Sequence, residues 1–192
     1  MLRRICLFAC LATVIALISA ATSSSANFKN SMSPQVTWHH HCISTAHFCA
    51  DFPYITGMKF SYGHSVFDGA TSATRKSDDW SSGVGRNVKT GKPCEAVIAS
   101  GCQQEFYAID VFKSKYSDPW QALTAINGGV TNPTRTTFDG NLAAKFNDLY
   151  GYIGYTVWHR GEVYYIHAGY YPGPRKTKPA FATKFFSSIK LT

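Results

Sequence analysis

The fold of this chain follows from residues 152–170, which read YIGYTVWHRGEVYYIHAGY. Two runs of residues, 152–159 and 162–170, alternate side chains of different character on either side of Arg160 and Gly161. Because every second residue of a strand faces the same side, this pattern predicts a β-hairpin with a two-residue turn.

The turn also predicts the register of this hairpin, with Val157 opposite Tyr164 and Tyr155 opposite Ile166. One face is then apolar and consists of Ile153, Tyr155, Val157, Tyr164, Ile166 and Ala168. The opposite face consists of Tyr152, Thr156, Trp158, Val163, Tyr165 and His167. A slip of one residue would exchange the two faces, so burial of the apolar face favours this register.

The second face offers candidate ligand-binding residues: Trp158, Tyr165 and His167. If this face is open, its flat amphipathic rings can stack on a sugar or a peptide. If the C-terminal helix packs on it, the same side chains belong to the core. The sequence leaves both interpretations open, and the exposure of Trp158 distinguishes them.

The chain before this hairpin predicts further strands and one helix. Strands are expected at residues 36–43 and 48–52, with Pro53 ending the second, and at residues 105–116. Residues 57–93 are rich in Gly, Ser, Thr and Asp and predict mostly loop, with a short strand near 59–62. A helix begins at Pro119, capped by Asp118, and ends before Gly128.

A further hairpin and a second helix complete the expected elements. Residues 135–138 and 142–146 flank a tight turn at residues 139–141. Residues 179–191 show apolar side chains at helical spacing and predict an amphipathic C-terminal helix. The expected fold class is α+β: an antiparallel sheet of about five to seven strands, with a mid-chain helix and the C-terminal helix packed on it.

The first 26 residues predict a signal peptide. Arg3 and Arg4 precede an apolar run that is too short to span a bilayer, and small residues follow it up to Ala26. We therefore expect a signal peptide at 1–26, a flexible lead-in at 27–35 and a single domain at 36–192. The expected location is secreted or periplasmic, with no membrane span after cleavage.

Outside the leader the cysteines are Cys42, Cys49, Cys94 and Cys102. They allow three pairings, and an oxidising compartment favours disulfides over buried free thiols. We expect Cys42 to pair with Cys49 and Cys94 with Cys102, because each bridge then needs only local geometry. A zinc site is disfavoured, because neither spacing matches the short gap of a structural zinc knuckle.

Basic and histidine-rich segments offer weaker signals. The net charge is +8, but no nucleic-acid-binding motif accompanies it, so we expect no nucleic-acid partner. Arg86, Lys89 and Lys92 lie in a segment that departs from the spacing of a phosphate-binding loop, and they are candidate ligand-binding residues of a basic loop.

Residues 39–41 are three consecutive histidines, of which at most two can face one ion on a strand. We predict no metal and no cofactor.

Residues from about 105 to 191 resemble the PsbP-like superfamily and related exported bacterial proteins of unknown function. The resemblance is carried by the segments FYAIDV (106–111), GNLAA (140–144), RGEVYYI (160–166) and FFSSIKL (185–191). It implies an antiparallel sheet with helices packed against it and a family that mostly binds partners. It transfers no catalytic residue and no specific partner.

The function expected from the sequence is an exported, non-catalytic binding domain for a protein, peptide or cell-envelope ligand. No catalytic residue is assigned, and the sequence does not predict an oligomeric state. The alternative is a small secreted hydrolase that uses His64 with Asp51, Asp78 or Asp79. An enzyme requires His64 and an acid to converge in a pocket, whereas a binding domain leaves these residues dispersed.

Overall fold

The computed structural model describes residues 35–55, 60–68, 74–87, 89–90, 92–94, 101–114, 116–126, 130–148, 151–171 and 178–192. The predicted signal peptide and nearly all of the predicted lead-in lie outside these residues, as does the expected end of the first helix at Gly128. Every element described below belongs to one unit, Pro34–Thr192.

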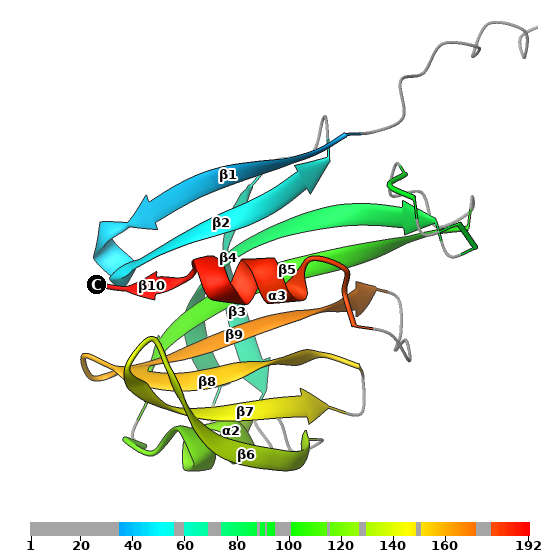
Figure 1. Cartoon of the computed structure of the whole chain (residues 1–192). Coiled ribbons are helices and arrows are strands. Elements are labelled where there is room, and N and C mark those ends of the chain that lie inside the picture. Colours follow the sequence, from blue (N-terminus) through cyan, green and yellow to red (C-terminus); the bar gives the residue numbers. More distant parts are fainter. Residues whose placement is uncertain are drawn as a thin grey trace, which may run out of the picture. The chain divides into compact units, whose positions relative to one another are not determined.

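Seven strands form a large antiparallel sheet (Figure 1). Their order is β3 (Ser61–Asp68), β4 (Thr74–Asn87), β5 (Cys102–Lys113), β9 (Glu162–Tyr171), β8 (Ile153–His159), β7 (Asn141–Asp148) and β6 (Val130–Phe138). A small sheet contains β1 (Val36–Ile43), β2 (Phe48–Ile55) and β10 (Lys190–Leu191). The helices are α2 (Pro119–Ile126) and α3 (Ala182–Ser188), and a 3-10 turn covers Ser44–Ala46. The α+β class predicted from the sequence is confirmed.

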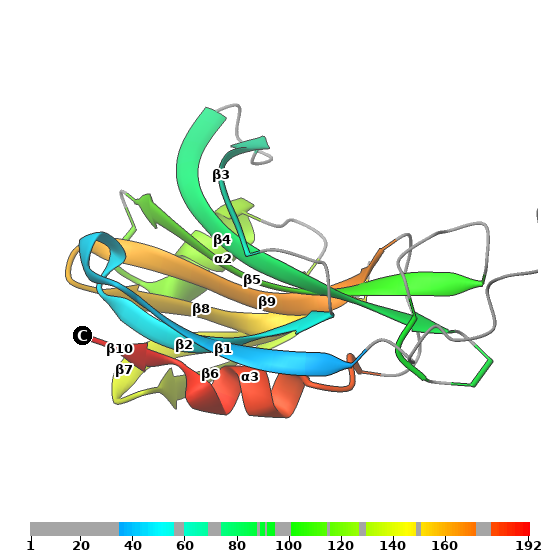
Figure 2. The same ribbon diagram turned by 90° about the horizontal axis from the view of Figure 1, so that it is seen from above.

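The large sheet has a helix on each face (Figure 2). One face packs against α3 and the small sheet, with Tyr164, Ile166 and Phe185 fully buried between them. The other face packs against α2, with Leu123 and Val163 in its core. The predicted β8–β9 register is confirmed, because Val157 lies opposite Tyr164 and Tyr155 opposite Ile166.

The first hairpin matches the prediction except at Pro53. Cys42 lies directly opposite Cys49, but β2 continues through Pro53 to Ile55. The Cys42–Cys49 pair has a Cα separation of 4.0 Å, which is typical of a non-hydrogen-bonded pair. Pro53 lies four residues after Cys49 on β2, so its pair with Trp38 is also non-hydrogen-bonded. Its missing N–H therefore faces away from β1, on the side where β10 pairs only with Phe48 and Cys49.

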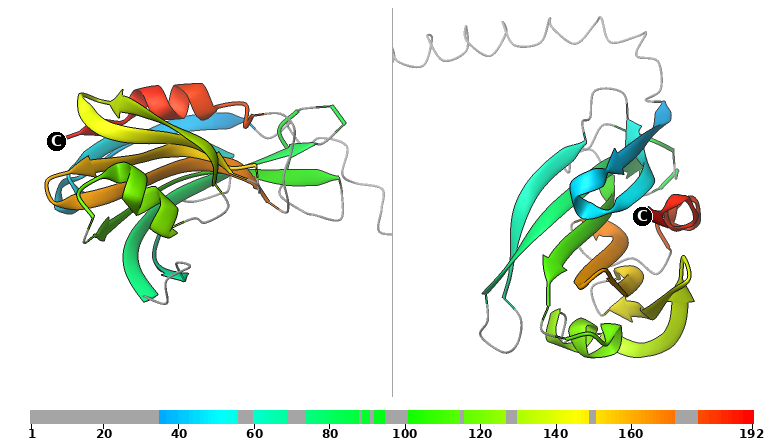
Figure 3. Two further views of the ribbon diagram at one scale, coloured as in Figure 1. Left: turned by 90° about the horizontal axis from the view of Figure 1, so that it is seen from below. Right: turned by 90° about the vertical axis from the view of Figure 1, so that its left-hand side faces the viewer.

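The predicted loop at 57–93 is wrong over most of its length. It contains β3 and the 14-residue β4, which pairs with β5 from Asp78 to Asn87. Small polar residues have low strand propensity, but pairing with the apolar β5 and burial of Trp80 and Val84 override it. Figure 3 shows β3 and the adjoining part of β4 curving out of the plane of the sheet, and Figure 2 places this curve on the side of α2.

The C-terminal helix is shorter than predicted. It covers Ala182–Ser188, after which Lys190 and Leu191 form β10 opposite Cys49 and Phe48. The helix ends because these residues satisfy their backbone in the small sheet instead. No helix in the described part of the chain is long and apolar enough to cross a membrane.

Local details of the predicted helix start and covalent framework are confirmed. Asp118 Oδ1 accepts a 2.9 Å hydrogen bond from the backbone N–H of Trp120, so Asp118 caps α2. The two disulfides join Cys42 to Cys49 and Cys94 to Cys102.

Candidate binding site

A cavity of about 410 Å³ lies between α3 and strands β6, β7 and β8. Its size falls within the range of small-molecule sites in proteins. The sheet side is lined by Phe138, Ile153, Gly154 and Tyr155. The helix side is lined by Ala182, Thr183, Phe186 and Ser187, and the remaining lining residues are Lys145, Asn147 and Lys178.

Aromatic rings form the apolar part of this cavity. The ring of Tyr155 lies 4.8 Å from that of Phe138 and 5.4 Å from that of Phe186, measured between centroids. Tyr155 and Phe186 are half-buried, so part of each ring faces the cavity rather than the core. Such rings offer a large rigid contact surface to an apolar ligand body.

Two lysines give the cavity its charge. Lys145 and Lys178 are both exposed, and the Nζ atom of Lys145 lies 6.0 Å from the centroid of the Tyr155 ring. No aspartate or glutamate is among the described residues that line the cavity. The lining therefore carries a net positive charge next to an aromatic floor, which favours an anionic group on the ligand.

The sheet register and the start of α3 place these residues. Lys145 lies opposite Tyr155 and Asn147 opposite Ile153, so all four share the face that α3 partly covers. The hydroxyl of Tyr170 donates a 3.0 Å hydrogen bond to the backbone carbonyl of Lys178, which fixes the segment leading into α3.

The predicted aromatic face is largely closed, but not by the helix considered in the sequence. Tyr165 is 3% exposed and stacks on Phe146 at 5.0 Å, and Trp158 is half-buried beside the cluster formed with α2. The covering helix is α2, whereas α3 packs on the opposite face. The side chain of His167 is 14% exposed.

His167 is held by a buried acid. Its Nε2 atom lies 2.8 Å from Oδ2 of Asp110, a residue that is 2% exposed. Rings of Phe106 and Tyr152 contact the imidazole, and its Nδ1 atom has no hydrogen-bond partner among the described residues. No serine or cysteine of the described part is hydrogen-bonded to this imidazole.

The predicted basic loop separates into two kinds of residue. Arg86 is 13% exposed, and its Nε donates a 2.6 Å hydrogen bond to the fully buried Glu105. Its guanidinium also lies 5.0 Å from the Phe181 ring centroid. Lys89 and Lys92 are exposed, in a turn where the Asn87 side chain accepts hydrogen bonds from the Lys89 and Thr90 backbone. Arg86 therefore has a structural contact, and only the two lysines face solvent.

The structure separates Asp51 from the other residues of the alternative hydrolase, but it places His64 and Asp78 at facing positions of β3 and β4. Asp51 lies in the small sheet and accepts a hydrogen bond from His40 at 2.7 Å, whereas Asp78 accepts one from the hydroxyl of Tyr62 at 3.2 Å. Asp79 follows Asp78 on β4 and so faces the opposite side of the sheet. His64 lies opposite Asp78 in the β3–β4 register, but its side chain is outside the described part.

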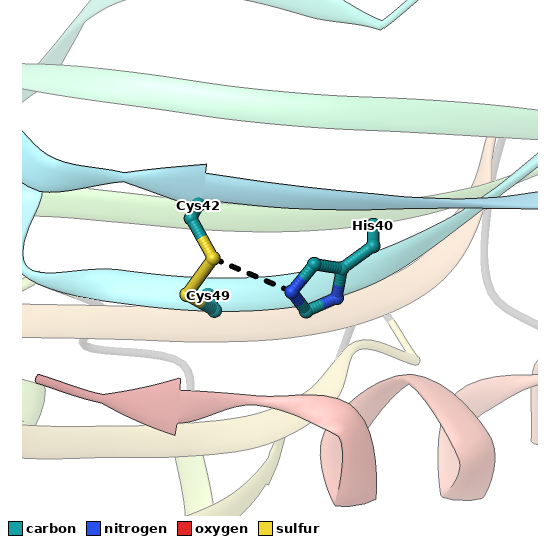
Figure 4. A group of neighbouring side chains, drawn as sticks. All are labelled: His40, Cys42 and Cys49. Atoms are coloured by element: carbon teal, nitrogen blue, oxygen red, sulfur yellow. Dashed lines mark hydrogen bonds between the residues drawn. A yellow bond between two sulfur atoms is a disulfide. The ribbon is translucent and has the colours of Figure 1, made fainter.

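One cluster has the composition of a metal site. His40, Cys42 and Cys49 place their ligand atoms within 4.8 Å of one another (Figure 4). The two sulfurs are bonded to each other, however, so neither is the thiolate that binds metal ions. In its oxidised state this cluster is a disulfide with an adjacent imidazole.

Sequence reasoning missed the cavity. Lys145 lies on β7, Phe186 on α3 and Lys178 in the segment before α3, and their meeting depends on which strands α3 covers. The sequence predicted only one part of the lining, because Ile153 and Tyr155 lie on the predicted apolar face of the hairpin.

Comparisons with known proteins add no relative. No family model, no curated protein and no solved structure matches the chain. The resemblance to the PsbP-like superfamily therefore rests on the quoted segments alone.

Proposed function

We propose that this protein is an exported, non-catalytic binding domain whose ligand is a small amphipathic anion. The ligand's apolar body occupies the cavity between α3 and β6–β8, and its anionic group lies near Lys145 and Lys178. The observation that carries this proposal is the cavity of about 410 Å³, with aromatic rings on its floor and no acidic side chain among the described residues that line it.

Export is part of the proposal. The predicted leader and the two disulfides favour an oxidising compartment, secreted or periplasmic. The cavity has the size of a small-molecule site, so an envelope lipid or free acid suits it better than the broad surface of a folded protein partner. The alternative hydrolase would use His64 and Asp78, which face each other across β3 and β4, and neither residue lines the cavity between α3 and β6–β8.

Binding can be tested with a fluorescent amphipathic anion, 1-anilinonaphthalene-8-sulfonate, titrated into the full chain. We expect saturable binding with one site, and weaker binding of N-phenyl-1-naphthylamine, which has a similar aromatic body without the sulfonate. The double variant Lys145→Ala/Lys178→Ala should raise the Kd for the sulfonate about tenfold, equivalent to roughly 1.4 kcal/mol.

Lys113→Ala is the matched control, because it removes an exposed lysine of the same charge from β5, outside the cavity. Its Kd should equal that of the wild type. Equal affinity for the charged and neutral probes, or an unchanged Kd in the double variant, would contradict the proposal. Displacement of the probe by decanoate or by phosphatidylglycerol vesicles then distinguishes a free acid from a membrane lipid.

A further inference from the structure

The Cys42–Cys49 disulfide lies on the outward face of the small sheet. In β2 the buried residues Phe48, Ala50 and Phe52 alternate with Cys49 and Asp51, so the cysteine and the acid face away from the core. Cys42 is exposed and Cys49 is half-buried. A thiol from solution can therefore approach this bond without unfolding the domain.

An imidazole lies against this disulfide. His40 Nε2 is 3.3 Å from Cys42 Sγ (Figure 4). On the other side of the ring, His40 Nδ1 is 2.7 Å from Asp51 Oδ1. In the imidazolium form, Nδ1–H donates to the carboxylate and Nε2–H donates to the sulfur. The carboxylate thus orients the ring so that Nε2 faces Cys42.

We propose that the Cys42–Cys49 disulfide is a thiol–disulfide exchange site in which His40 is the general acid. A thiolate attacks Cys49 Sγ and forms a mixed disulfide with it. The bond to Cys42 breaks, its electron pair goes to Cys42 Sγ, and this sulfur takes the proton from His40 Nε2. A second thiol of the same class then releases Cys49 as a thiol, so that two external thiols are oxidised to one disulfide.

Proton transfer from His40 to the leaving sulfur supports attack at Cys49, because exchange is faster when the leaving thiol departs more easily. Lys190 on β10 lies directly opposite Cys49 in the sheet register, but its Nζ is held 3.2 Å from Asp139 Oδ1, so its charge is already paired.

The second disulfide is an internal control. Cys102 is 5% exposed, and Cys94 is half-buried. Within the described residues, no imidazole is hydrogen-bonded to either of these sulfurs. The two bonds of one molecule therefore differ in access and in the neighbouring acid.

The experiment exposes the oxidised full chain to reduced glutathione, quenches with acid and alkylates the free thiols. Digestion after Lys59 separates the two cysteine pairs, so mass spectrometry gives the rate of reduction for each bond. Wild type should reduce Cys42–Cys49 at least about tenfold faster than Cys94–Cys102. In His40→Ala and His40→Gln the Cys42–Cys49 rate should fall by a similar factor.

His39→Ala is the matched control, because His39 is an exposed neighbour on β1 that faces the other side of the strand. It should leave both rates unchanged. The side chain of His40 is 62% exposed, so its replacement is tolerated by the fold, and the Cys94–Cys102 rate measures any general loosening. Equal rates for the two bonds in the wild type, or a Cys42–Cys49 rate that His40→Ala does not lower, would overturn the proposal.

Discussion

The hydroxyl of Tyr107 donates a 2.7 Å hydrogen bond to Oε2 of Glu105, two residues away on β5, although both side chains are fully buried. The other carboxylate oxygen accepts from Arg86 Nε and from the backbone N–H of Ala180. The Tyr107 hydroxyl accepts in turn from the backbone N–H of Phe181. This buried network ties the segment before α3 to the large sheet.

Loss of the cation in this network should be strongly destabilising. Arg86→Met leaves the Glu105 carboxylate buried without its charge partner, and we expect the free energy of unfolding to fall by about 3–5 kcal/mol. Urea unfolding followed by circular dichroism measures this change. Lys89→Met is the control, because Lys89 is exposed in the neighbouring turn, and its effect should stay within about 0.5 kcal/mol. Similar values for the two variants would contradict the assigned role of Arg86.

A side chain at Gly154 should not fit. A Cβ atom there would collide with the carbonyl oxygen of Ile166 and lie 2.9 Å from the Phe146 ring. Gly154→Ala should therefore lower the free energy of unfolding by about 1–3 kcal/mol. At Gly63, also in a strand, a Cβ would meet nothing within 4 Å, so Gly63→Ala should be close to neutral in the same urea experiment. A neutral Gly154→Ala would show that β8 and β9 are less tightly packed than described.

Tyr54 should make the fold sensitive to alkali. Burial raises its pKa to about 12, whereas the unfolded chain releases the phenol proton near 10. Since the folded state keeps the proton over this interval, stability is retained below pH 10 and is lost as the pH rises toward 12. Tyr54→Phe removes this contribution, so its unfolding midpoint in urea should depend less steeply on pH in this window. Parallel pH profiles for the two proteins would refute the prediction.

His41 should make the fold less stable at mildly acidic pH. Desolvation lowers its pKa, with smaller contributions from the neighbouring His39 and His40, while Tyr54 lies within hydrogen-bond distance and Phe60 stacks on the ring. The unfolded chain therefore binds a proton first, and stability falls as the pH drops below about 6.5. His41→Phe keeps the stacking and removes the titration, so its thermal midpoint should fall less between neutral and mildly acidic pH. An equal fall would show that His41 is not the responsible group.

The parts of the fold that the sequence predicted correctly depend on local chemistry. The turns at residues 139–140 and 160–161 adopt positive φ angles, which Gly140 and Gly161 accommodate, and they determine the registers of both hairpins. The Asp118 cap and the two disulfides likewise involve residues close in the chain.

The parts of the fold that the sequence did not predict depend on contacts between residues far apart in the chain. β4 has a polar, glycine-containing sequence, and it is a strand because β5 lies beside it and Trp80 is buried against Phe48. The end of α3 depends on the pairing of Lys190 with Cys49, and the cavity depends on which strands α3 covers. Neither the composition nor the periodicity of residues 74–87 or 179–191 contains this information.

The backbone N–H of Asp51 is bonded to the Ser188 hydroxyl, 137 residues further along, and β10 completes the small sheet beside it. The β1–β2 hairpin therefore lacks its β10 neighbour until Lys190 and Leu191 have been synthesised, although β2 also packs against Trp80 of β4. Completion of the small sheet is thus a late step in the folding of this domain.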